Sequence, residues 1–399
     1  MKHKVLVAGG GIGGLAMALA ASRVDWNVHL LEQACAFTDI GAGIQLGPNV
    51  VKVLHHWGLA EALRQVAAFP DVLQVRSAVS GAVLGSLRLG AVMAARYSAP
   101  YATVHRADLH GLLLEAVQQH TDVQLHVAQA LQRFDQTAHT VTVHTKNDLV
   151  IEGQALVGAD GLWSTTRQQL LGDLPPQRTG HLAYRALVLQ ASLPERLRSQ
   201  QVTVWLGKRM HVVHYPVRGG AWLNVVAILH GDSTPDEGWD NSAHAADLAG
   251  ALAGSHAMLQ DRVRAITQWR MWPVCDRPPM QGAHQHAQGR VALLGDAAHP
   301  MRPYLAQGAG MAIEDAAELG HALALVARRA DDVPAALQRY GLNRWQRNAR
   351  VQTRARRNGQ IFHAQGVVRW GRDASMKWLG EKILDMPWLY GGTVAGSSP

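Results

Sequence analysis

Apolar residues in this chain follow two patterns, one near its ends and one in its middle. Near the ends, Val5–Ala8 and Val291–Leu294 are short continuous apolar runs that stop at glycine, as parallel strands buried on both faces do. The first run leads through a glycine turn into an Ala- and Leu-rich stretch at 15–23, and then into a second apolar run at 27–31. This order predicts a strand–helix–strand unit at the start of the chain.

Residues 180–230 are antiparallel in character, because short apolar segments follow one another closely with turn residues between them. The predicted strands are joined at one point by a hairpin turn at Gly219-Gly220, and they lie at 182–191, 202–206, 210–217 and 222–229. Strands are also predicted within 72–104 and 123–151, and helices at 47–67, 109–119, 311–330 and from 335 onward. We therefore expect an α/β fold with a Rossmann-like, mostly parallel sheet, a second, antiparallel sheet and C-terminal helices.

Composition and charge narrow the class of protein. Hydrophobic residues make up 48% of the 399 residues and charged residues 17%, which excludes a disordered or coiled-coil chain. The net charge of +8 favours anionic ligands but says nothing about the fold. Two cysteines, Cys35 and Cys275, are too few for a disulfide framework. Residues 1–22 imitate a secretory signal, but their glycines are poor helix formers, and no apolar run reaches the roughly 18 residues of a membrane span. We expect a cytoplasmic protein.

The glycines at 9–14 fit the G-x-G-x-x-G pattern through Gly9, Gly11 and Gly14. The first glycine permits a tight turn, the second lets a pyrophosphate approach the backbone, and the third lets the helix pack on the strand. The helix N-terminus then offers free N–H groups to the phosphates. Glu32 closes the second strand at about the distance, some 20 residues on, where an acid accepts hydrogen bonds from a ribose. This context predicts a dinucleotide site, although the motif alone does not separate FAD from NAD.

Two later segments also place an acid after a predicted strand. Asp160-Gly161 is followed by Ser164 and Arg167, and Gly295-Asp296 is followed by Ala297-Ala298-His299-Pro300 and then by Gln307-Gly308-Ala309-Gly310. Either segment alone is compatible with an ordinary strand-to-helix turn capped by an aspartate. Their order after the glycine motif is the more specific signal.

Together the three motifs resemble those of the single-component flavoprotein aromatic hydroxylases, which share the para-hydroxybenzoate hydroxylase fold. The resemblance runs from Val5 to about Tyr340. The segments 41–49 and 105–109 look like the salicylate and 3-hydroxybenzoate 6-hydroxylase branch. The resemblance implies an FAD-binding domain in two parts, 1–175 (with substrate-side strands within 72–104) and 286–340, around a substrate domain at 176–285. A C-terminal helical segment at 341–399 follows.

The resemblance also implies one FAD per chain, with NAD(P)H as cosubstrate and NADH favoured. Glu32 would hold the adenosine ribose, Arg106 the phosphate and ribityl region, and Asp296 the ribityl chain. Asp160 would touch both FAD and NAD(P)H, and the backbone of Leu131 the adenine end. The full set implied to bind the cofactor is Gly9, Gly11, Gly13, Gly14, Glu32, Gln45, Arg106, Leu131, Asp160, Asp296, Gly308, Ala309 and Gly310.

The predicted strand at 210–217 carries candidate catalytic groups. His211 and Tyr215 share one of its faces and lie about 13 Å apart along it, so they can bracket the two ends of a small ring. In the 3-hydroxybenzoate branch a His and a Tyr occur at this same spacing. Flavin chemistry delivers electrophilic oxygen, so the ring must be electron-rich, and a histidine that deprotonates a phenol makes it so. Both residues are equally compatible with a structural role in the sheet.

The segment 302–305 departs from the relatives that the motifs resemble. The 3-hydroxybenzoate branch tends to carry Gln where Pro303 stands, which removes a polar contact to the substrate. The 6-hydroxynicotinate branch tends to carry His where Gln45 and Tyr304 stand, which argues against that substrate. The ring position that is hydroxylated therefore stays open, as does the effect of Pro303 on the pocket.

We therefore expect an FAD-dependent monooxygenase that uses NAD(P)H and O2 to hydroxylate a phenolic aromatic carboxylate, with 3-hydroxybenzoate (6-hydroxylation to gentisate) or salicylate foremost. Two alternatives stay open. One is a flavin-dependent oxidoreductase that inserts no oxygen or acts on a larger aromatic, and the other is a flavin-binding regulatory protein.

Other partners receive little support from the sequence. Arginines at 344, 347, 350 and 354 follow helical spacing, but no aromatic platform accompanies them, so nucleic acid is not expected. A solvated helix face, a contact in a homodimer and a peripheral contact with anionic lipid remain open for them. The paired histidines His55-His56 and His284/His286 have no third ligand at an obvious spacing, and we expect no metal.

Overall fold

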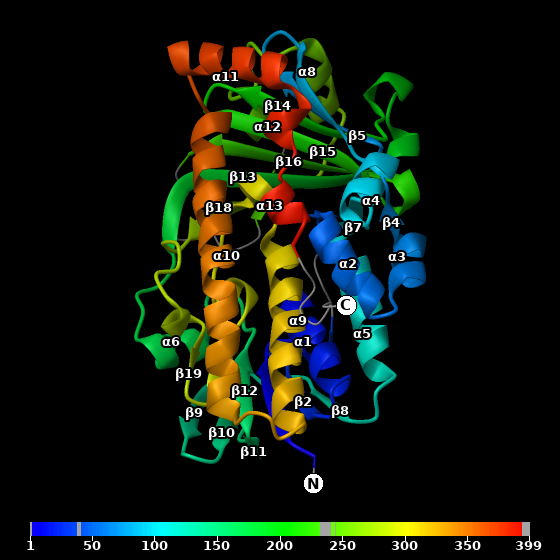
Figure 1. The fold of residues 1–399 in the computed structure, drawn as a ribbon. Coiled ribbons are helices and arrows are strands. Elements are labelled where there is room, and N and C mark those ends of the chain that lie inside the picture. Colours follow the sequence, from blue (N-terminus) through cyan, green and yellow to red (C-terminus); the bar gives the residue numbers. More distant parts are fainter. Residues whose placement is uncertain (1, 38–40, 232–240, 244, 393–399) are drawn as a thin grey trace.

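Two large sheets, one parallel and one antiparallel, make up the molecule in a computed structural model that describes residues 2–37, 41–231, 241–243 and 245–392. They lie at its two ends (Figure 1). The parallel one has six strands in the order β19 (Ala287–Gln288), β20 (Val291–Leu293), β12 (Ala155–Gly158), β1 (Lys4–Ala8), β2 (Asn27–Leu31) and β8 (Val123–His126). Only β19 runs antiparallel to its neighbour among these described strands.

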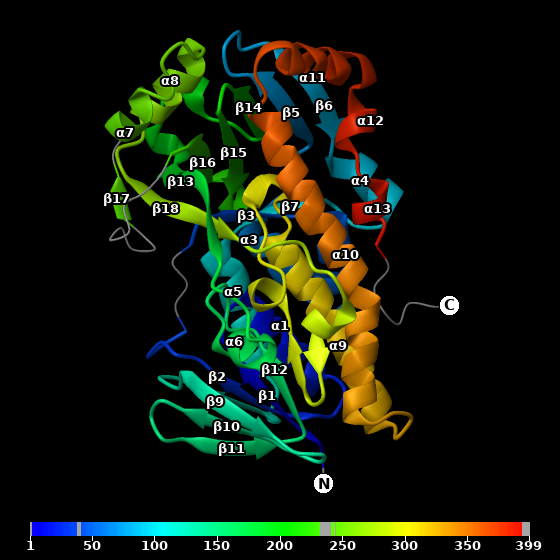
Figure 2. The same ribbon diagram turned by 90° about the vertical axis from the view of Figure 1, so that its left-hand side faces the viewer.

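Both faces of the six-stranded sheet are covered, which explains its continuous apolar strands. Val5 and Val7 of β1 point into a core shared with helices, whereas Leu6 and Ala8 point into a second core on the opposite face. The first face is covered by α1 (Ile12–Ser22), α5 (Arg106–Gln118) and α9 (Gly308–Ala327). The second is covered by a small antiparallel sheet (Figure 2) of β9 (Leu131–Gln136), β10 (Val141–Thr145) and β11 (Val150–Gly153).

The second large sheet has eight strands and forms the other end of the molecule. Their order is β17 (Asn241–Ala243), β18 (Trp269–Asp276), β13 (Gln177–Leu189), β16 (Trp222–His230), β15 (Met210–Val217), β14 (Val202–Gly207), β5 (Val72–Ser77) and β6 (Val83–Arg88). All neighbours pair antiparallel except β14 and β5. The fold class predicted from the sequence is confirmed. The division into domains at 175, 285 and 340 stays a prediction.

Smaller elements join the two ends. A three-stranded sheet of β3 (Gly43–Leu46), β7 (Ala102–His105) and β4 (Ala67–Ala68) lies between them. The remaining α-helices are α2 (Pro48–His56), α3 (Ala60–Val66), α4 (Gly90–Tyr97), α6 (Thr165–Leu171), α7 (Ala245–Ala249), α8 (Ala257–Arg264), α10 (Val333–Phe362), α11 (Gly366–Leu379), α12 (Glu381–Leu384) and α13 (Pro387–Tyr390). No helix of the described ranges is long and apolar enough to cross a membrane.

Two details differ from the sequence prediction. The segment 72–104, in which strands are predicted, also contains α4, which begins at Gly90 with a φ of +24° that a side chain would strain. The first strand in the segment 123–151 is β8, which is separate from the other three and pairs parallel with β2. The strand itself is predicted by the local pattern, but its partner is set by tertiary contacts.

The long helix α10 links the two ends of the molecule through a buried cluster of charges (Figure 1 and Figure 2). Arg344 donates from Nε to Asp315 Oδ1 at 2.8 Å and from Nη1 to Glu314 Oε2 at 2.8 Å. Burial raises the pKa of Asp315, but the charges of His299 and Arg344 outweigh it and hold that pKa well below its usual range. Asp315 also accepts from the backbone N–H of Gly295 at 3.2 Å, so the cluster fixes the loop that begins there.

Candidate active site

A cavity of about 1150 Å³ is bordered by residues of both large sheets. It begins where β1 ends, at the glycine turn. Gly9 takes a φ of +105° and packs against the carbonyl of Ala159, so the turn requires a glycine there. Gly11 faces open space, because an added Cβ would meet no atom within 4 Å, and it lines the cavity. This is the close approach that a pyrophosphate needs at the second glycine.

The other two glycines of the motif serve packing. A Cβ on Gly14 would collide with the carbonyl oxygen of Gly9, where α1 crosses β1. A Cβ on Gly13 would lie 2.7 Å from Leu294 Cδ1, toward the core rather than the cavity. Gly14 therefore has the role predicted for the third glycine, and Gly13 supports the turn from behind.

Glu32 lies directly after β2 and lines the cavity. Its Oε2 accepts from the N–H of Gly10 at 2.7 Å, and its Oε1 accepts from the N–H of Ala34 at 2.8 Å. Each carboxylate oxygen retains a lone pair for a ribose hydroxyl. Leu131, at the start of β9, and Arg106, at the start of α5, also border the cavity.

The Asp160 loop forms another wall. Asp160 accepts from Ser164 Oγ at 2.5 Å and from the N–H of Thr166 at 2.9 Å, so it organises the start of α6. Burial raises the pKa of Asp160, against these hydrogen bonds, which lower it. Arg167 then donates to the carbonyls of Ala297 and Ala298, at 3.1 and 2.6 Å, and ties this loop to the Gly295 loop.

The Gly295 loop presents Asp296 to the cavity while its neighbours are buried. Gly308 begins α9, and a Cβ there would have Asp296 Oδ1 as its nearest neighbour at 4.0 Å, so the helix N-terminus faces this acid across an open gap. Gly310 packs instead against Val50 and the Gln307 side chain, and Ala309 lies between these two glycines in the first turn of α9.

This donor set fits FAD. All of the following line the cavity: the glycine turn would offer backbone N–H groups, Arg106 and Lys146 would offer cations to a diphosphate, and Glu32 and Asp296 would offer acceptors to hydroxyls. The open space at Gly11 is the observation that tests the fit, because a glycine turn without a ligand needs no such clearance. When bound, FAD would supply the redox chemistry.

The sheet beyond the cavity carries the predicted substrate residues on one face. Arg185 of β13, Val226 of β16 and Val213 of β15 are directly paired across three strands, so their side chains share that face. All three are partly exposed, whereas His211 and Tyr215, the neighbours of Val213 on this face, are 2% and 4% exposed. The three residues therefore form a row across this face, with His211 and Tyr215 on either side of Val213 along β15.

The cavity lining reaches this face at Arg185 and Leu187. Among the described residues, it does not include Val226, Val213, His211, Tyr215 or Gln45. Tyr215 donates its hydroxyl to the carbonyl of Gly43 at 2.7 Å. Burial raises the pKa of Tyr215 so far that its hydroxyl stays neutral at physiological pH. The side chain of Gln45 accepts a hydrogen bond from the hydroxyl of Tyr101 at 2.7 Å.

His211 is part of a cluster of imidazoles. Its Nδ1 lies 2.8 Å from Nε2 of His363, and Nδ1 of His363 lies 2.8 Å from Nε2 of His230. His181 packs against the last two rings, and its Nδ1 lies 2.8 Å from the hydroxyl of Tyr304. Burial lowers the pKa of His211 to about 3, of His363 to about 2 and of His181 to about 4.

Several of these groups were not identified from the sequence. Arg185 was detectable, since it is a lone charge in an apolar strand; its guanidinium lies 3.9 Å from the centre of the Trp272 ring, which also lines the cavity. His363 was not, because it follows α10, 152 residues after its partner His211. Nothing in a local pattern indicates that pairing.

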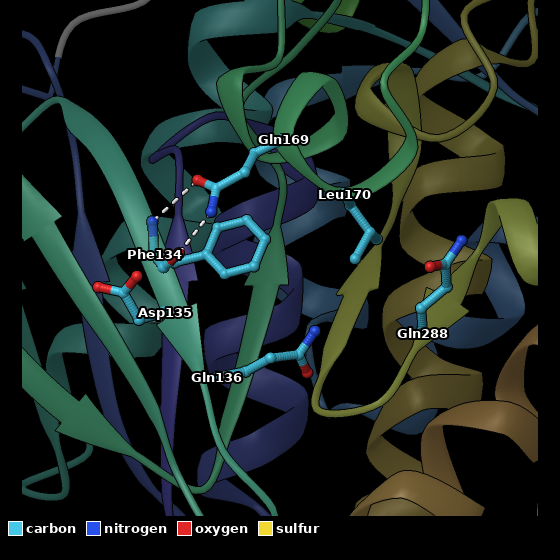
Figure 3. A pocket seen from close by; sticks show the side chains of 6 residues that line it. All are labelled: Phe134, Asp135, Gln136, Gln169, Leu170 and Gln288. Atoms are coloured by element: carbon cyan, nitrogen blue, oxygen red, sulfur yellow. Dashed lines mark hydrogen bonds between the residues drawn. The ribbon is translucent and has the colours of Figure 1, made fainter.

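A second hollow of about 310 Å³ lies at the far end of the molecule, between β9, α6 and β19 (Figure 3). Gln169 crosses it to accept from the N–H of Phe134 at 3.0 Å. Its one ionisable lining residue is Asp135, which pairs with Arg133 and with His144. It therefore has no group free for chemistry, and the large cavity is the candidate site.

Comparisons with known proteins point to the same chemistry. Residues 2–355 match the model of a family described as FAD binding domain. A 3-hydroxybenzoate 6-hydroxylase of Polaromonas naphthalenivorans (strain CJ2) is 39% identical over 394 residues, which are 98% of this chain and 96% of that protein. A salicylate hydroxylase–substrate complex is similar with a TM-score of 0.83 at 26% identity, covering 98% of this chain and 96% of the other. Klebsiella pneumoniae HpxO complexed with FAD and uric acid has a TM-score of 0.84 at 26% identity, covering 96% and 94%.

Substituting Gly11→Ala should weaken FAD binding by at least about tenfold, because the new methyl group occupies the space of the pyrophosphate. Titration of the apoprotein with FAD, followed by flavin fluorescence, measures this. Gly111→Ala is the matched control, since Gly111 lies in α5 and also has no neighbour within 4 Å of an added Cβ. Equal affinity in the two variants would contradict the assignment of Gly11.

The free energy of unfolding should decrease as the pH falls below about 6.5. Buried imidazoles with lowered pKa, among them His181, His211 and His363, stay neutral when folded but take up protons when unfolded, so each contributes a slope of up to about 1.4 kcal/mol per pH unit. Urea unfolding at pH 7 and pH 5 measures the slope. His181→Gln should reduce the slope by the contribution of about one proton, whereas His139→Gln, at an exposed site, should leave the slope unchanged. A slope equal in wild type and His181→Gln would refute this account.

Proposed function

This chain belongs to the FAD binding domain family and is a flavin-dependent aromatic monooxygenase, and on that premise we propose that its substrate is a phenolic aromatic carboxylate. The resemblance drawn from the three motifs is confirmed. Within the proposal, 3-hydroxybenzoate, converted by 6-hydroxylation to gentisate, comes first and salicylate second. Support comes from relatives named 3-hydroxybenzoate 6-hydroxylase at 39%, 38% and 36% identity, and from the likeness to salicylate hydroxylase.

The observation that carries the proposal is the row of Arg185, Val226 and Val213, which would form the floor of the substrate pocket. Two valines offer a flat apolar surface for one aromatic ring, and strands about 4.8 Å apart give a length suited to a single ring. At one end of the row, the guanidinium of Arg185 suits a carboxylate. A ring lying on the valines would then have His211 and Tyr215 at its two edges, where a phenol needs a base and a hydrogen-bonding partner.

His211 would accept the phenol proton at its ring nitrogen Nε2, since Nδ1 is engaged with His363. Removing that proton raises the electron density of the ring, which an electrophilic oxygen attacks. FAD, reduced by NAD(P)H, would activate O2 and supply that oxygen when bound. Tyr215, held by the Gly43 carbonyl, would exclude water from the opposite edge.

Pro303 lines the cavity and has no N–H to donate. Tyr304, which follows it, packs over Ala183 and Ile228, beside His211. Pro303 therefore offers no hydrogen-bond donor to a substrate, which leaves the carboxylate to Arg185.

Four finer points are part of the same proposal; the first three rest on the resemblance, and the last rests on the small number of cysteines and the absence of a long apolar run. These are NADH as the preferred reductant, Glu32, Arg106, Asp296 and Asp160 as the cofactor contacts predicted above, a homodimer, and a cytoplasmic location.

The function is tested by measuring NADH consumption and product formation with a panel of hydroxybenzoates. We expect 3-hydroxybenzoate to stimulate NADH consumption and to yield gentisate in equal amount, with oxygen from ¹⁸O2 in the new hydroxyl group. Stimulation that yields only hydrogen peroxide would identify the acid as an effector rather than the substrate. No stimulation by any hydroxybenzoate would refute the proposed substrate class.

Arg185→Met should raise the KM for 3-hydroxybenzoate by about ten- to a hundredfold, since a hydrogen bond to a charged group contributes about 1.5–3 kcal/mol. The KM for 3-methylphenol, which has no carboxylate, should be nearly the same in Arg185→Met and in the wild type. Arg270→Met is the matched variant, because Arg270 also lines the cavity and is paired with Arg185 across the sheet. A larger increase in KM for Arg270→Met than for Arg185→Met would show that Arg270, not Arg185, binds the carboxylate.

A further inference from the structure

An unbroken series of hydrogen bonds runs from His211, beside the proposed substrate pocket, to the surface. His211 bonds to His363, and His363 bonds to His230, each at 2.8 Å between ring nitrogens. The three residues come from β15, from the end of α10 and from the end of β16. His211 and His363 are 2% and 6% exposed, whereas His230 is exposed to solvent. The series therefore connects a buried histidine to a solvent-exposed one.

A buried histidine cannot by itself hold the proton of a phenol. Burial, first, and then the neighbouring imidazoles keep the pKa of His211 and His363 far below neutrality, so neither ring carries a charge for long. A neutral imidazole has one N–H and one lone pair, at opposite nitrogens. Such a ring can accept a proton at its free nitrogen if it gives up the proton from its N–H at the same time. Here each ring can give up that proton because its N–H is hydrogen-bonded to the next ring.

We infer that His211, His363 and His230 form a proton relay between the substrate's phenol and solvent. The inference rests on the proposed function, in which His211 faces that phenol. His363 is a positioning and relay residue, since it acts through His211. No other described histidine bonds both to His211 and to a solvent-exposed ring.

The protons balance along the series. The phenol O–H bond breaks as an N–H bond forms at Nε2 of His211. The proton on Nδ1 of His211 moves to Nε2 of His363, the proton on Nδ1 of His363 moves to Nε2 of His230, and His230 releases the proton on its Nδ1 to water. Every ring ends neutral with its tautomer reversed. When the hydroxylated product takes up a proton, the same steps run backward and restore the tautomers.

The groups around the relay do not interrupt it. His181 stacks against His230 and His363 but bonds to Tyr304, and the ring of Tyr304 lies beside His211 and His363. Phe362 packs on His211 as an apolar lid. The charged groups that act on the cluster are cations, which disfavour a trapped proton, apart from Asp276; they are Arg209 at His230, Arg372 at His363, and Arg302 with Asp276 at His181.

A metal ion is the main alternative occupant, because His181, His230 and His363 bring nitrogens close together. The spacing decides against it. Two nitrogens on one Zn²⁺, at about 2.0–2.1 Å each in a tetrahedron, lie roughly 3.3 Å apart. His230 and His363 are instead 2.8 Å apart, the separation of nitrogens that share a proton.

The relay is tested in the oxidised holoenzyme, without NADH, by mixing with 3-hydroxybenzoate in a weakly buffered solution of a pH indicator. Stopped-flow absorbance then follows phenolate formation and the release of its proton. His363→Phe should slow both by about tenfold or more, and free imidazole added to His363→Ala should restore the rate. His230→Gln, at the exposed end, should also slow the release of the proton. This variant keeps the relay testable if the variants at the buried His363 do not fold. His181→Gln is the matched control and should keep the wild-type rate.

Wild-type rates in both His363→Phe and His230→Gln would overturn the relay while leaving the hydroxylase intact. Loss of the wild-type rate on treatment with EDTA, with recovery on adding Zn²⁺, would replace the relay by a metal site. Absence of both phenolate and gentisate in the wild-type enzyme would instead refute the proposed function and the relay with it. A shift of the pH profile of proton release in His363→Phe, with unchanged FAD content, separates the relay from a merely structural role.

Discussion

The buried ion pairs of Arg344 with Asp315 and Glu314 are the constraint on which the rest of the site depends. Glu314 also pairs with Arg347 and Asp315 with His299, so a shift of α10 against α9 would break several buried ion pairs in a medium that cannot solvate the charges. Asp315 also holds the N–H of Gly295, which places Asp296 at the cavity. At its other end, the same α10 delivers Phe362 and His363 to the substrate sheet. One set of charges thus positions both the cofactor side and the substrate side.

The two sheets contribute different kinds of order. The parallel sheet ends in turns whose backbone is exposed, and Gly9, Gly11 and Asp160 use those turns to border the cavity. The antiparallel sheet contributes side chains through its register instead, so that Arg185, Val226 and Val213 form one row across three strands. A shift of one residue in that register would turn the row to the opposite face and remove the floor of the pocket. The reaction therefore needs both an exact turn and an exact pairing.

The sequence was most informative where function depends on neighbours along the chain. The glycine turn, Glu32 after its strand and the shared face of His211 and Tyr215 all follow from local spacing. It was least informative where residues far apart meet. The bond between His211 and His363, the stacking of Arg185 on Trp272 and the pairing of β8 with β2 depend on tertiary contacts that no local period encodes. Gly90 shows the same limit, since a glycine can end a strand or begin a helix.

The late position of His363 in the chain has a consequence for biosynthesis. Ribosomes make proteins from the N-terminus at about 5–20 residues per second, so β15 leaves the ribosome well before the end of α10. Until α10 has been made, Phe362 does not cover His211, and His211 lacks the hydrogen bond to His363. The glycine turn and the cofactor walls at Glu32 and Asp160 are made much earlier. A growing chain thus contains the glycine turn, Glu32 and Asp160 long before it contains His363, so the ring that bonds to His211 is among the last parts of the molecule to be made.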